Sequence, residues 1–164
     1  KKSRKVIAVD IADKMIERAK LLNFNENIEY ICGNILDMEF ENDSLDVIIT
    51  TATAHHLPYE WLLCFVKDKL KKDGRLIILD LAKAKSFSDY VLWGSAFIPN
   101  IIMNLIKNGR LHKDDAHSKD VWERHGKNDT YMTMDEIKSL ANKHLPTAQI
   151  KRKLFWRYVL IWEK

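Results

Sequence analysis

The feature of this sequence that most constrains its fold is a short β-branched run that stops at an acidic residue and is followed at once by a helical pattern. Val6, Ile7 and Val9 form the run and Asp10 ends it. Such a run is typical of a parallel strand that is buried on both faces. Asp10 then lies at the carboxyl end of the strand, where open α/β sheets bind ligands and a carboxylate can accept hydrogen bonds from ribose hydroxyls. A helix cap or a solvated turn is the plainer alternative, and Asp13 could also serve as the cap.

The composition is that of a globular protein and excludes several classes. Of the 164 residues, 46% are hydrophobic and 30% are charged, which predicts one packed domain and not a disordered chain. The 27 basic residues are scattered among 23 acidic ones, so nucleic acid is not expected as the principal partner. No signal peptide is recognisable and no apolar run reaches the ~20 residues of a membrane span, so we expect a cytoplasmic protein.

The two cysteines, Cys32 and Cys64, lie far apart and lack the spacing of metal ligands. Each stands in an apolar context, so we expect buried free thiols in a reducing compartment. No histidine has ligand spacing either, and no metal site is expected.

Strand and helix patterns alternate through the first half of the chain. Apolar runs predict strands at residues 28–32, 46–51 and 75–80. A helix follows the first strand, and another starts at Pro58 and closes at Asp73-Gly74. This βαβαβ order predicts a parallel sheet with right-handed crossovers and helices on both faces.

Residues 81–130 break the alternation and form an inserted segment. Their apolar part, residues 87–106, contains Trp93 and Phe97, and Pro99 interrupts any single straight helix. A lid over an active site, a contact in a homodimer and an interfacial membrane helix are the alternatives. We favour a cap or lid over the carboxyl ends of the strands, which would select an apolar acceptor.

Regular patterns return in the C-terminal part. Thr133 and Glu136 have the spacing of a capping box at the start of a helix over residues 134–144. Two strands, at residues 148–154 and 156–162, follow each other too closely for a helical crossover. They are therefore predicted to form an antiparallel hairpin.

Five short motifs then occur in a consistent order. They are Val9-Asp10, Cys32-Gly33-Asn34-Ile35-Leu36-Asp37, Asp46-Val47-Ile48-Ile49-Thr50-Thr51, Ala54-His55-His56-Leu57 and Leu70-Lys71-Lys72-Asp73-Gly74-Arg75-Leu76. Together they resemble the motifs of class I S-adenosylmethionine-dependent methyltransferases of the small-molecule type. The resemblance covers residues 5–81, and the C-terminal hairpin is similar to the reversed last strand of that fold. It implies a Rossmann-like α/β fold, with a mostly parallel twisted sheet and an antiparallel C-terminal strand, in a single domain over residues 1–164.

The sequence departs from this family at its most specific motif, the glycine-rich loop after the first strand. All five glycines lie elsewhere, at Gly33, Gly74, Gly94, Gly109 and Gly126. We therefore expect an N-terminally incomplete chain, in which the first strand and this loop precede Lys1 in the native protein. The alternative is a degenerate fold that has lost the cofactor.

The resemblance also implies which residues bind S-adenosylmethionine. Asp10 would accept the ribose hydroxyls and Ile11 would lie against the adenine, with ordinary core as the alternative for Ile11. Met15 is a further cofactor-binding candidate. Asn34 stands where the family usually has an acidic residue, and its amide oxygen could accept the adenine amino group while the N–H of Ile35 reaches a ring nitrogen. A plain turn is the alternative for Asn34.

Two adjacent pairs complete the candidate site. Thr50 and Thr51 end a strand near the expected sulfonium, and Thr51 is a cofactor-binding candidate. His55 and His56 are the catalytic candidates, because imidazole is a base near neutral pH. A methyl sulfonium is already activated, so a base is needed only where the acceptor loses a proton. Packing or loop orientation is the alternative for both histidines.

These observations predict an enzyme that transfers a methyl group from S-adenosylmethionine to a small-molecule acceptor, apolar or lipid-like. Two other classes stay open. One is a nicotinamide-dependent oxidoreductase, which also has an acidic residue after its second strand. The other is a non-catalytic binding module with a methyltransferase-like fold.

Overall fold

The computed structural model describes residues 3–83, 131–154 and 156–164. The chain divides into two compact units, residues 1–41 and residues 42–164. From residue 84 onward, the predicted cap over residues 81–130 lies outside the described residues. None of the described helices is long and apolar enough to span a membrane.

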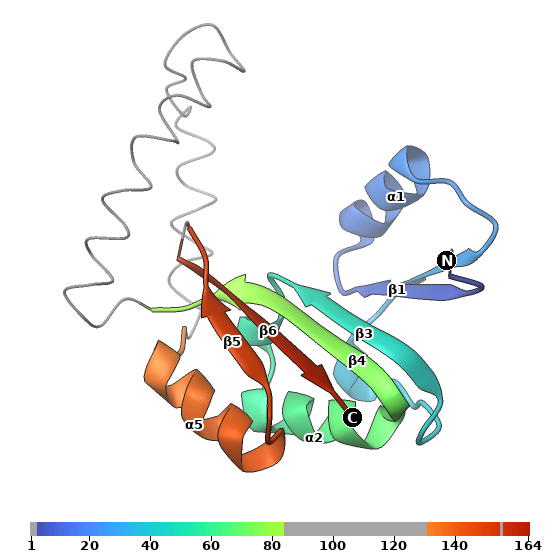
Figure 1. Ribbon diagram of the computed structural model, residues 1–164. Helices are drawn as coiled ribbons and strands as arrows, with labels where there is room; N and C mark the ends of the chain where they lie inside the picture. The colour runs from blue at the N-terminus through green and yellow to red at the C-terminus, as the bar shows by residue number, and fades with distance from the viewer. Residues whose placement is uncertain (1–2, 84–130, 155) are drawn as a thin grey trace, which may run out of the picture. The chain divides into compact units, whose positions relative to one another are not determined.

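The first unit is a strand, a helix and a second strand, followed by a short 3-10 turn (Figure 1). In chain order its elements are β1 (Val6–Asp10), α1 (Asp13–Leu22), β2 (Ile28–Cys32) and η1 (Ile35–Asp37). The two strands pair in parallel, with Val6 opposite Ile28 and Asp10 opposite Cys32. Both strands therefore end at the same edge, as the predicted βαβ order requires.

Two expectations for the first unit are wrong. Val6 and Ile7 are each 36% exposed, because within this unit β1 pairs only with β2 and α1 is the helix packed on the pair. The run of β1 is therefore not buried on both faces. Asp13 is not a cap, since Ala12 is the N-cap residue of α1 and the Asp13 carboxylate accepts the N–H of Lys14 at 2.6 Å.

The second unit contains a four-stranded sheet in the order β3-β4-β6-β5. In chain order its elements are β3 (Leu45–Thr51), η2 (Ala54–His56), α2 (Tyr59–Lys69), β4 (Leu70–Leu81), α5 (Met134–His144), β5 (Gln149–Arg152) and β6 (Arg157–Glu163). β3 and β4 are parallel, whereas β6 runs antiparallel to both β4 and β5. The prediction of an antiparallel closing hairpin is confirmed.

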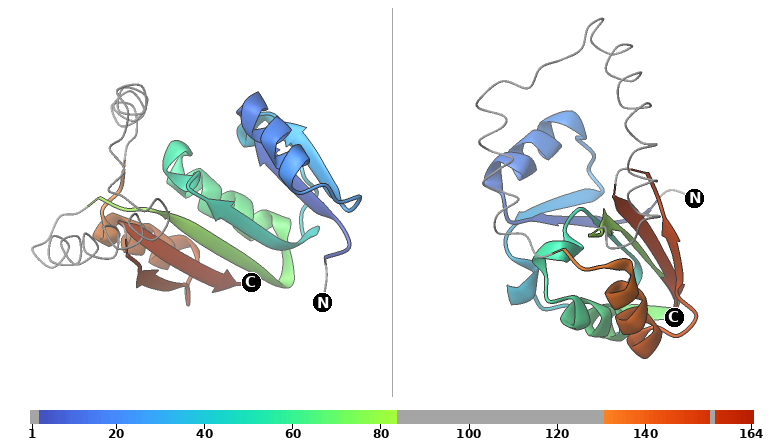
Figure 2. Two further views of the ribbon diagram at one scale, coloured as in Figure 1. Left: turned by 90° about the horizontal axis from the view of Figure 1, so that it is seen from above. Right: turned by 90° about the vertical axis from the view of Figure 1, so that its left-hand side faces the viewer.

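The core of the second unit lies where α2 and α5 pack against one face of this sheet (Figure 2). Period-2 alternation places every second residue of the strands on that face. The largest buried residues come from α2, β4, α5 and β6. They include Leu63, Val66, Leu76, Ile78, Ile137, Tyr158 and Leu160. α5 starts with the predicted capping box, in which Thr133 Oγ1 accepts the N–H of Glu136 and the Glu136 carboxylate accepts the N–H of Thr133.

The two helices of this unit, α2 and α5, do not cover the opposite face of the sheet. On β3, Ile48 packs against the core, while Val47 and Ile49 point the other way and are 51% and 65% exposed. The prediction of helices on both faces is therefore not met by the described residues of this unit.

Both cysteines are exposed, so the expectation of buried thiols is wrong. Cys32 is the last residue of β2, where the strand leaves its pairing partner. Cys64 lies on the outer side of α2, one helical turn after Glu60, while Leu62, Leu63 and Val66 supply the buried side.

The junction of α2 and β4 also differs from the expectation that Asp73-Gly74 closes the helix. α2 ends at Lys69, and β4 starts at once at Leu70, which pairs with Leu45. The pairing then shifts, so that Val47 lies opposite Arg75. The residues between Leu70 and Arg75 form a bulge. Within it Asp73 has a φ of 63°, which agrees with the turn that the pair Asp73-Gly74 predicts.

Replacing Gly74 by alanine is expected to destabilise the protein by about 1–3 kcal/mol. A Cβ at this position would lie 2.7 Å from the carbonyl oxygen of Lys71 and 3.2 Å from that of Leu45, and both are backbone atoms that cannot rotate away. Urea denaturation measures the loss. The control is Asp73→Gly, which should cost little because glycine adopts positive φ without strain. Equal midpoints for Gly74→Ala and the unchanged protein would contradict this close approach.

Candidate functional site

Asp10 lies at the carboxyl end of β1 with its carboxylate fixed by the backbone that follows. Its Oδ1 accepts the N–H of Ala12 at 2.8 Å, and the N–H of Gly33 donates to its carbonyl oxygen at 2.9 Å. The second bond ties the ends of β1 and β2 together. No described residue bonds Oδ2 of this partly buried side chain. Asp10 therefore offers an oriented carboxylate with acceptor capacity for a diol.

Asn34 and Ile35 follow at the end of β2. Asn34 is the N-cap of η1, and its Oδ1 accepts the N–H of Leu36 at 3.1 Å. The Asn34 side chain thus caps the turn, as in the plainer alternative. Its oxygen still has a second lone pair, and its amide nitrogen still has its donors. Ile35 is the first residue of η1, so its backbone N–H has no partner inside that helix. Both residues lie at the edge to which β1 brings Asp10.

Apolar side chains of the first unit are exposed near the same strand end. Ile11, directly after Asp10, is 74% exposed, and Met15 on α1 is 55% exposed. Ile11 is therefore not a core residue among the described residues. Exposed apolar surface next to a fixed carboxylate is the combination that a nucleoside needs, because the base is apolar on its faces and the ribose is polar.

Thr50 and Thr51 end β3 in the second unit. Thr51 is exposed, and its carbonyl oxygen accepts the hydroxyl of Thr53 at 3.0 Å. Thr50 Oγ1 is buried and has no hydrogen-bond partner among the described residues. An unpaired buried hydroxyl costs free energy. Thr50, more than the predicted Thr51, is thus the hydroxyl on this strand that a ligand could satisfy.

His55 is held by a buried carboxylate that the sequence analysis did not single out. Asp80 Oδ1 lies 2.6 Å from His55 Nδ1, and Asp80 Oδ2 accepts the backbone N–H of His55 at 3.1 Å. The side chains are 7% and 1% exposed, respectively. A carboxylate facing Nδ1 keeps the proton on that nitrogen, so in the neutral imidazole Nε2 carries the acceptor lone pair. His56 is exposed, and its ring contacts that of His55 in a tilted arrangement with centroids 3.9 Å apart.

The position of Asp80 could have been found from the strand pattern. On β4, Leu76 and Ile78 point into the core, and the same alternation carries Asp80 to the buried face. Asp80 is the one charged residue that is buried among the described residues. A buried carboxylate needs donors, and His55 and the backbone N–H of Leu81, at 2.6 Å, provide them.

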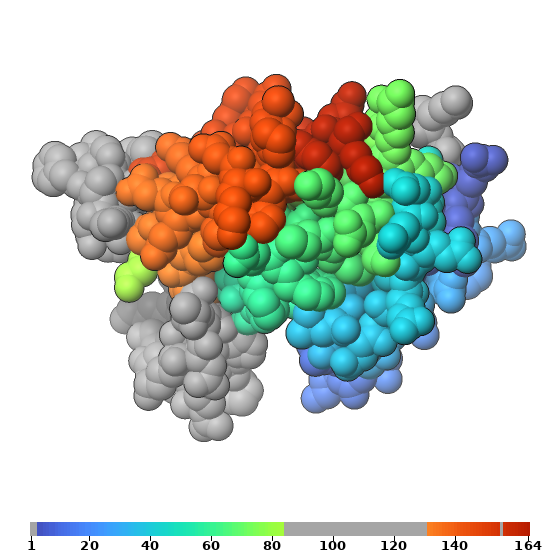
Figure 3. All heavy atoms as spheres, turned by 90° about the horizontal axis from the view of Figure 1, so that it is seen from below, coloured from blue at the N-terminus to red at the C-terminus, as the bar shows by residue number. Residues whose placement is uncertain are grey.

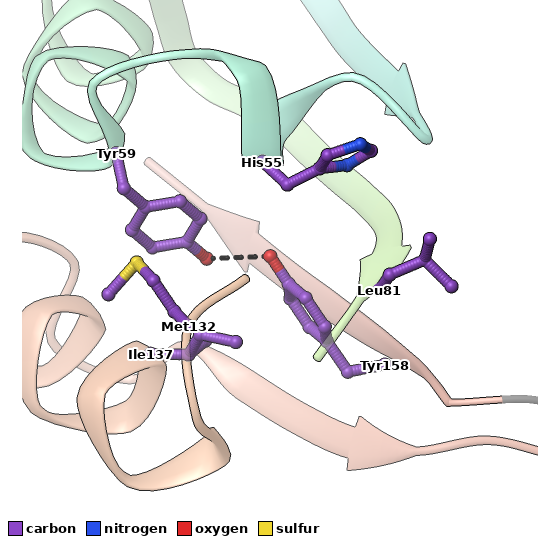
Figure 4. Close-up of a pocket in the computed structure, with 6 residues that line it drawn as sticks. All are labelled: His55, Tyr59, Leu81, Met132, Ile137 and Tyr158. Carbon is purple, nitrogen blue, oxygen red and sulfur yellow. Dashed lines mark hydrogen bonds between the residues drawn. The ribbon is translucent and has the colours of Figure 1, made fainter. Parts of the chain in front are cut away.

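Two buried tyrosines, Tyr59 and Tyr158, line a small cavity together with His55 (Figure 4). The hydroxyl of Tyr158 donates to that of Tyr59 at 3.1 Å. Burial raises the pKa of Tyr59 to about 12, and it also raises the pKa of Tyr158, so both phenols stay protonated at neutral pH. Together with His55 and three apolar residues they line a cavity of about 10 Å³. This volume holds about one water molecule.

The structure brings the predicted residues together in two groups. Asp10, Ile11, Asn34 and Ile35 share the carboxyl edge of the first unit, and Met15 lies on its helix. Thr51, His55 and His56 belong to the second unit, where His55 forms the pair with Asp80. In the first group the side chains point to nucleoside chemistry, and in the second to proton transfer.

Comparison with known proteins finds a match to one protein family and to several solved structures. Residues 1–78 match the methyltransferase domain family. No curated protein sequence matches the chain. Similar solved structures include PH0226 protein from Pyrococcus horikoshii, at 19% identity and a TM-score of 0.57, with 97% of this chain and 71% of that chain covered.

Two further structures are similar in the same way. A SAM-dependent methyltransferase from Aquifex aeolicus has 15% identity and a TM-score of 0.54, with 97% of this chain and 68% of that chain covered. The CMeT domain of the citrinin polyketide synthase has 13% identity and a TM-score of 0.58, with 96% and 38% covered.

The predicted resemblance to class I S-adenosylmethionine-dependent methyltransferases is thereby confirmed, and with it the Rossmann-like fold. The general activity of this family is methyl transfer, and the cofactor that it implies is S-adenosylmethionine. The residues at the carboxyl edge of the first unit fit the nucleoside part of that cofactor, because they combine a fixed carboxylate, an N–H at a turn and an exposed aliphatic side chain.

Proposed function

We propose that this chain binds S-adenosylmethionine at the carboxyl edge of β1 and β2 and transfers its methyl group to a small-molecule acceptor. The geometry of Asp10 carries this proposal. Its carboxylate is oriented by the N–H of Ala12, while Oδ2 keeps its acceptor capacity at a strand end. A vicinal diol needs two acceptors that are held in place, and open α/β sheets bind nucleosides at this edge.

The other residues of the edge hold the base in this proposal. Ile11 and Met15 supply apolar surface for the adenine, and the backbone N–H of Ile35 donates to a ring nitrogen. The second lone pair of Asn34 Oδ1 accepts the adenine amino group. When bound, S-adenosylmethionine supplies a methyl group that its sulfonium has already activated.

His55 is the general base of this proposal. It takes a proton from the methyl acceptor in those cases where that molecule must lose one. Asp80 keeps a proton on Nδ1 of His55 and so leaves Nε2 as the accepting atom. His56 is exposed and takes a packing role against the ring of His55.

The acceptor in this proposal is a small apolar or lipid-like molecule. Support comes from the sequence that follows β4, in which residues 87–106 are mostly apolar and include Trp93, Phe97 and Met103. Apolar pockets with a few polar groups suit such acceptors.

Calorimetry with the full-length protein tests the cofactor. S-adenosylmethionine and S-adenosylhomocysteine are expected to bind, and nicotinamide dinucleotides are not. Formation of S-adenosylhomocysteine with a panel of quinols, phenols and lipids then tests transfer. Binding of a nicotinamide dinucleotide instead would support the oxidoreductase, and cofactor binding with no turnover on any acceptor would support a binding module.

A further inference from the structure

Three chemically active side chains meet between α2 and α5, in the second unit and apart from the groups described above. Cys64 Sγ lies 3.6 Å from His144 Nδ1, and His144 Nε2 lies 2.7 Å from Glu60 Oε1. Glu60 and Cys64 are one turn apart on α2, and His144 is the last residue of α5. Figure 3 shows α2 and α5 adjoining on this face of the molecule, in green and orange. The three side chains form a line of thiol, imidazole and carboxylate.

The carboxylate fixes which nitrogen of the imidazole faces the thiol as a base. Lys143 Nζ lies 2.6 Å from the same oxygen of Glu60, and the hydrogen bond from Lys143, followed by that from His144, lowers the pKa of the Glu60 carboxyl. Glu60 is therefore ionised and accepts the N–H of His144 Nε2. In the neutral imidazole the lone pair then lies on Nδ1, which faces Cys64 Sγ.

The surroundings hold the imidazole in place beside an accessible thiol. His144 ends α5, where the unpaired carbonyl groups of the last turn stabilise a positive charge. Its side chain is only 17% exposed, so the imidazole is held in place, while Cys64 is open to reagents. A thiol, a base within reach and a group that orients the base are the three parts of an activated nucleophile.

We propose that Cys64 is a nucleophilic modification site, at which His144 takes the thiol proton and Glu60 orients the imidazole. The substrates are small carbon electrophiles that bear a leaving group. The Cys64 proton passes to His144 Nδ1, Sγ attacks the carbon, and an S–C bond forms as the bond from carbon to the leaving group breaks with its electron pair. The leaving group departs as an anion and the imidazolium returns its proton to solvent. No oxidant or reductant is needed.

Cys32 is a matched internal control, because it is also exposed but its thiol contacts no imidazole among the described residues. Its Sγ contacts the carbonyl oxygen of Ile11 at 3.8 Å. The probe is iodoacetamide at neutral pH, and mass spectrometry of the separate peptides gives the alkylation rate of each thiol in the same tube. Cys64 is expected to react at least about tenfold faster than Cys32.

Three variants separate the parts of the proposed triad. His144→Gln should lower the Cys64 rate to about that of Cys32, and Glu60→Gln should lower it partly, because the imidazole loses its orientation. Lys143→Gln should keep the high rate, since it removes a positive charge and leaves the triad intact. Circular dichroism checks that each variant is folded, and the Cys32 rate should stay constant in all of them.

Equal rates for the two cysteines of the unchanged protein would overturn the proposal. A fast Cys64 that is unaffected by His144→Gln would overturn it too. Loss of rate in Lys143→Gln together with an unchanged rate in Glu60→Gln would show that the positive charge of Lys143 activates the thiol, and not the base.

Discussion

Replacing Asp10 by alanine is expected to weaken binding of S-adenosylhomocysteine by about ten- to a hundredfold. Hydrogen bonds to a charged acceptor are worth about 1.5–3 kcal/mol each, and the carboxylate would lose its bonds to the ribose. The bond from the Ala12 N–H to Oδ1 shows that this side chain is already oriented, so the ligand gains the interaction without ordering it. Calorimetric titration of the full-length variant gives the dissociation constant.

Two variants serve as controls for this loss. Asp13→Ala removes an exposed carboxylate three residues away, and His56→Ala removes an exposed imidazole of the second unit. Both should leave the affinity within about twofold. An unchanged dissociation constant for a folded Asp10→Ala protein would show that the nucleoside site is wrongly assigned.

Replacing Asp80 by alanine is expected to destabilise the protein by about 3–5 kcal/mol. The carboxylate accepts hydrogen bonds from the His55 ring, the His55 backbone and the Leu81 backbone, all in a buried position. Alanine would leave these donors without a partner away from water. Urea denaturation gives the difference in unfolding free energy.

A buried and an exposed carboxylate can be compared directly in this chain. Glu163 pairs with Arg75 at 2.6 Å, but both side chains are more than half exposed. Glu163→Ala should therefore cost less than about 1 kcal/mol. Asp80→Asn, which keeps an acceptor oxygen, should lie between the two. A loss below about 1 kcal/mol for Asp80→Ala would contradict the role of Asp80 in holding His55.

Local chemistry made much of the fold predictable. Short-range rules predict the parallel pairing of β1 and β2, the capping box of Thr133 and Glu136, and the antiparallel hairpin. The structure confirms all three. The end of α2 was predicted wrongly, because the turn pair Asp73-Gly74 lies in a bulge of β4 and not at a helix end. Glycine after an acidic residue marks both features, and only the pairing with β3 separates them.

Burial could not be predicted from the apolar runs alone. β1 was expected to be covered on both faces and both cysteines to be buried, yet Val6, Ile7, Cys32 and Cys64 are exposed. Burial depends on which elements pack together, and an apolar run in the sequence does not show what will pack against it. The same limit hid the pairing of Asp80 with His55, which lies 25 residues earlier in the chain.

The candidate nucleoside residues were predictable because their strand ends meet at one edge by the rule for parallel strands. Asp10 and Asn34 come from adjacent strands, and their neighbours Ile11 and Ile35 follow from the same register. The triad of Glu60, Cys64 and His144 could not be predicted from the sequence. α2 and α5 come from distant parts of the chain, and only their packing brings the three side chains together.

Amide chemical shifts of ¹⁵N-labelled full-length protein during titration with S-adenosylhomocysteine test the central claim most directly. The amides of Ile11, Ala12 and Ile35 are expected to shift in a saturable way, and those of Cys64 and His144 should not move. A nicotinamide dinucleotide at the same concentration should leave all of them in place. Saturating shifts confined to other residues, or none at all, would contradict a nucleoside site at the carboxyl edge of β1 and β2.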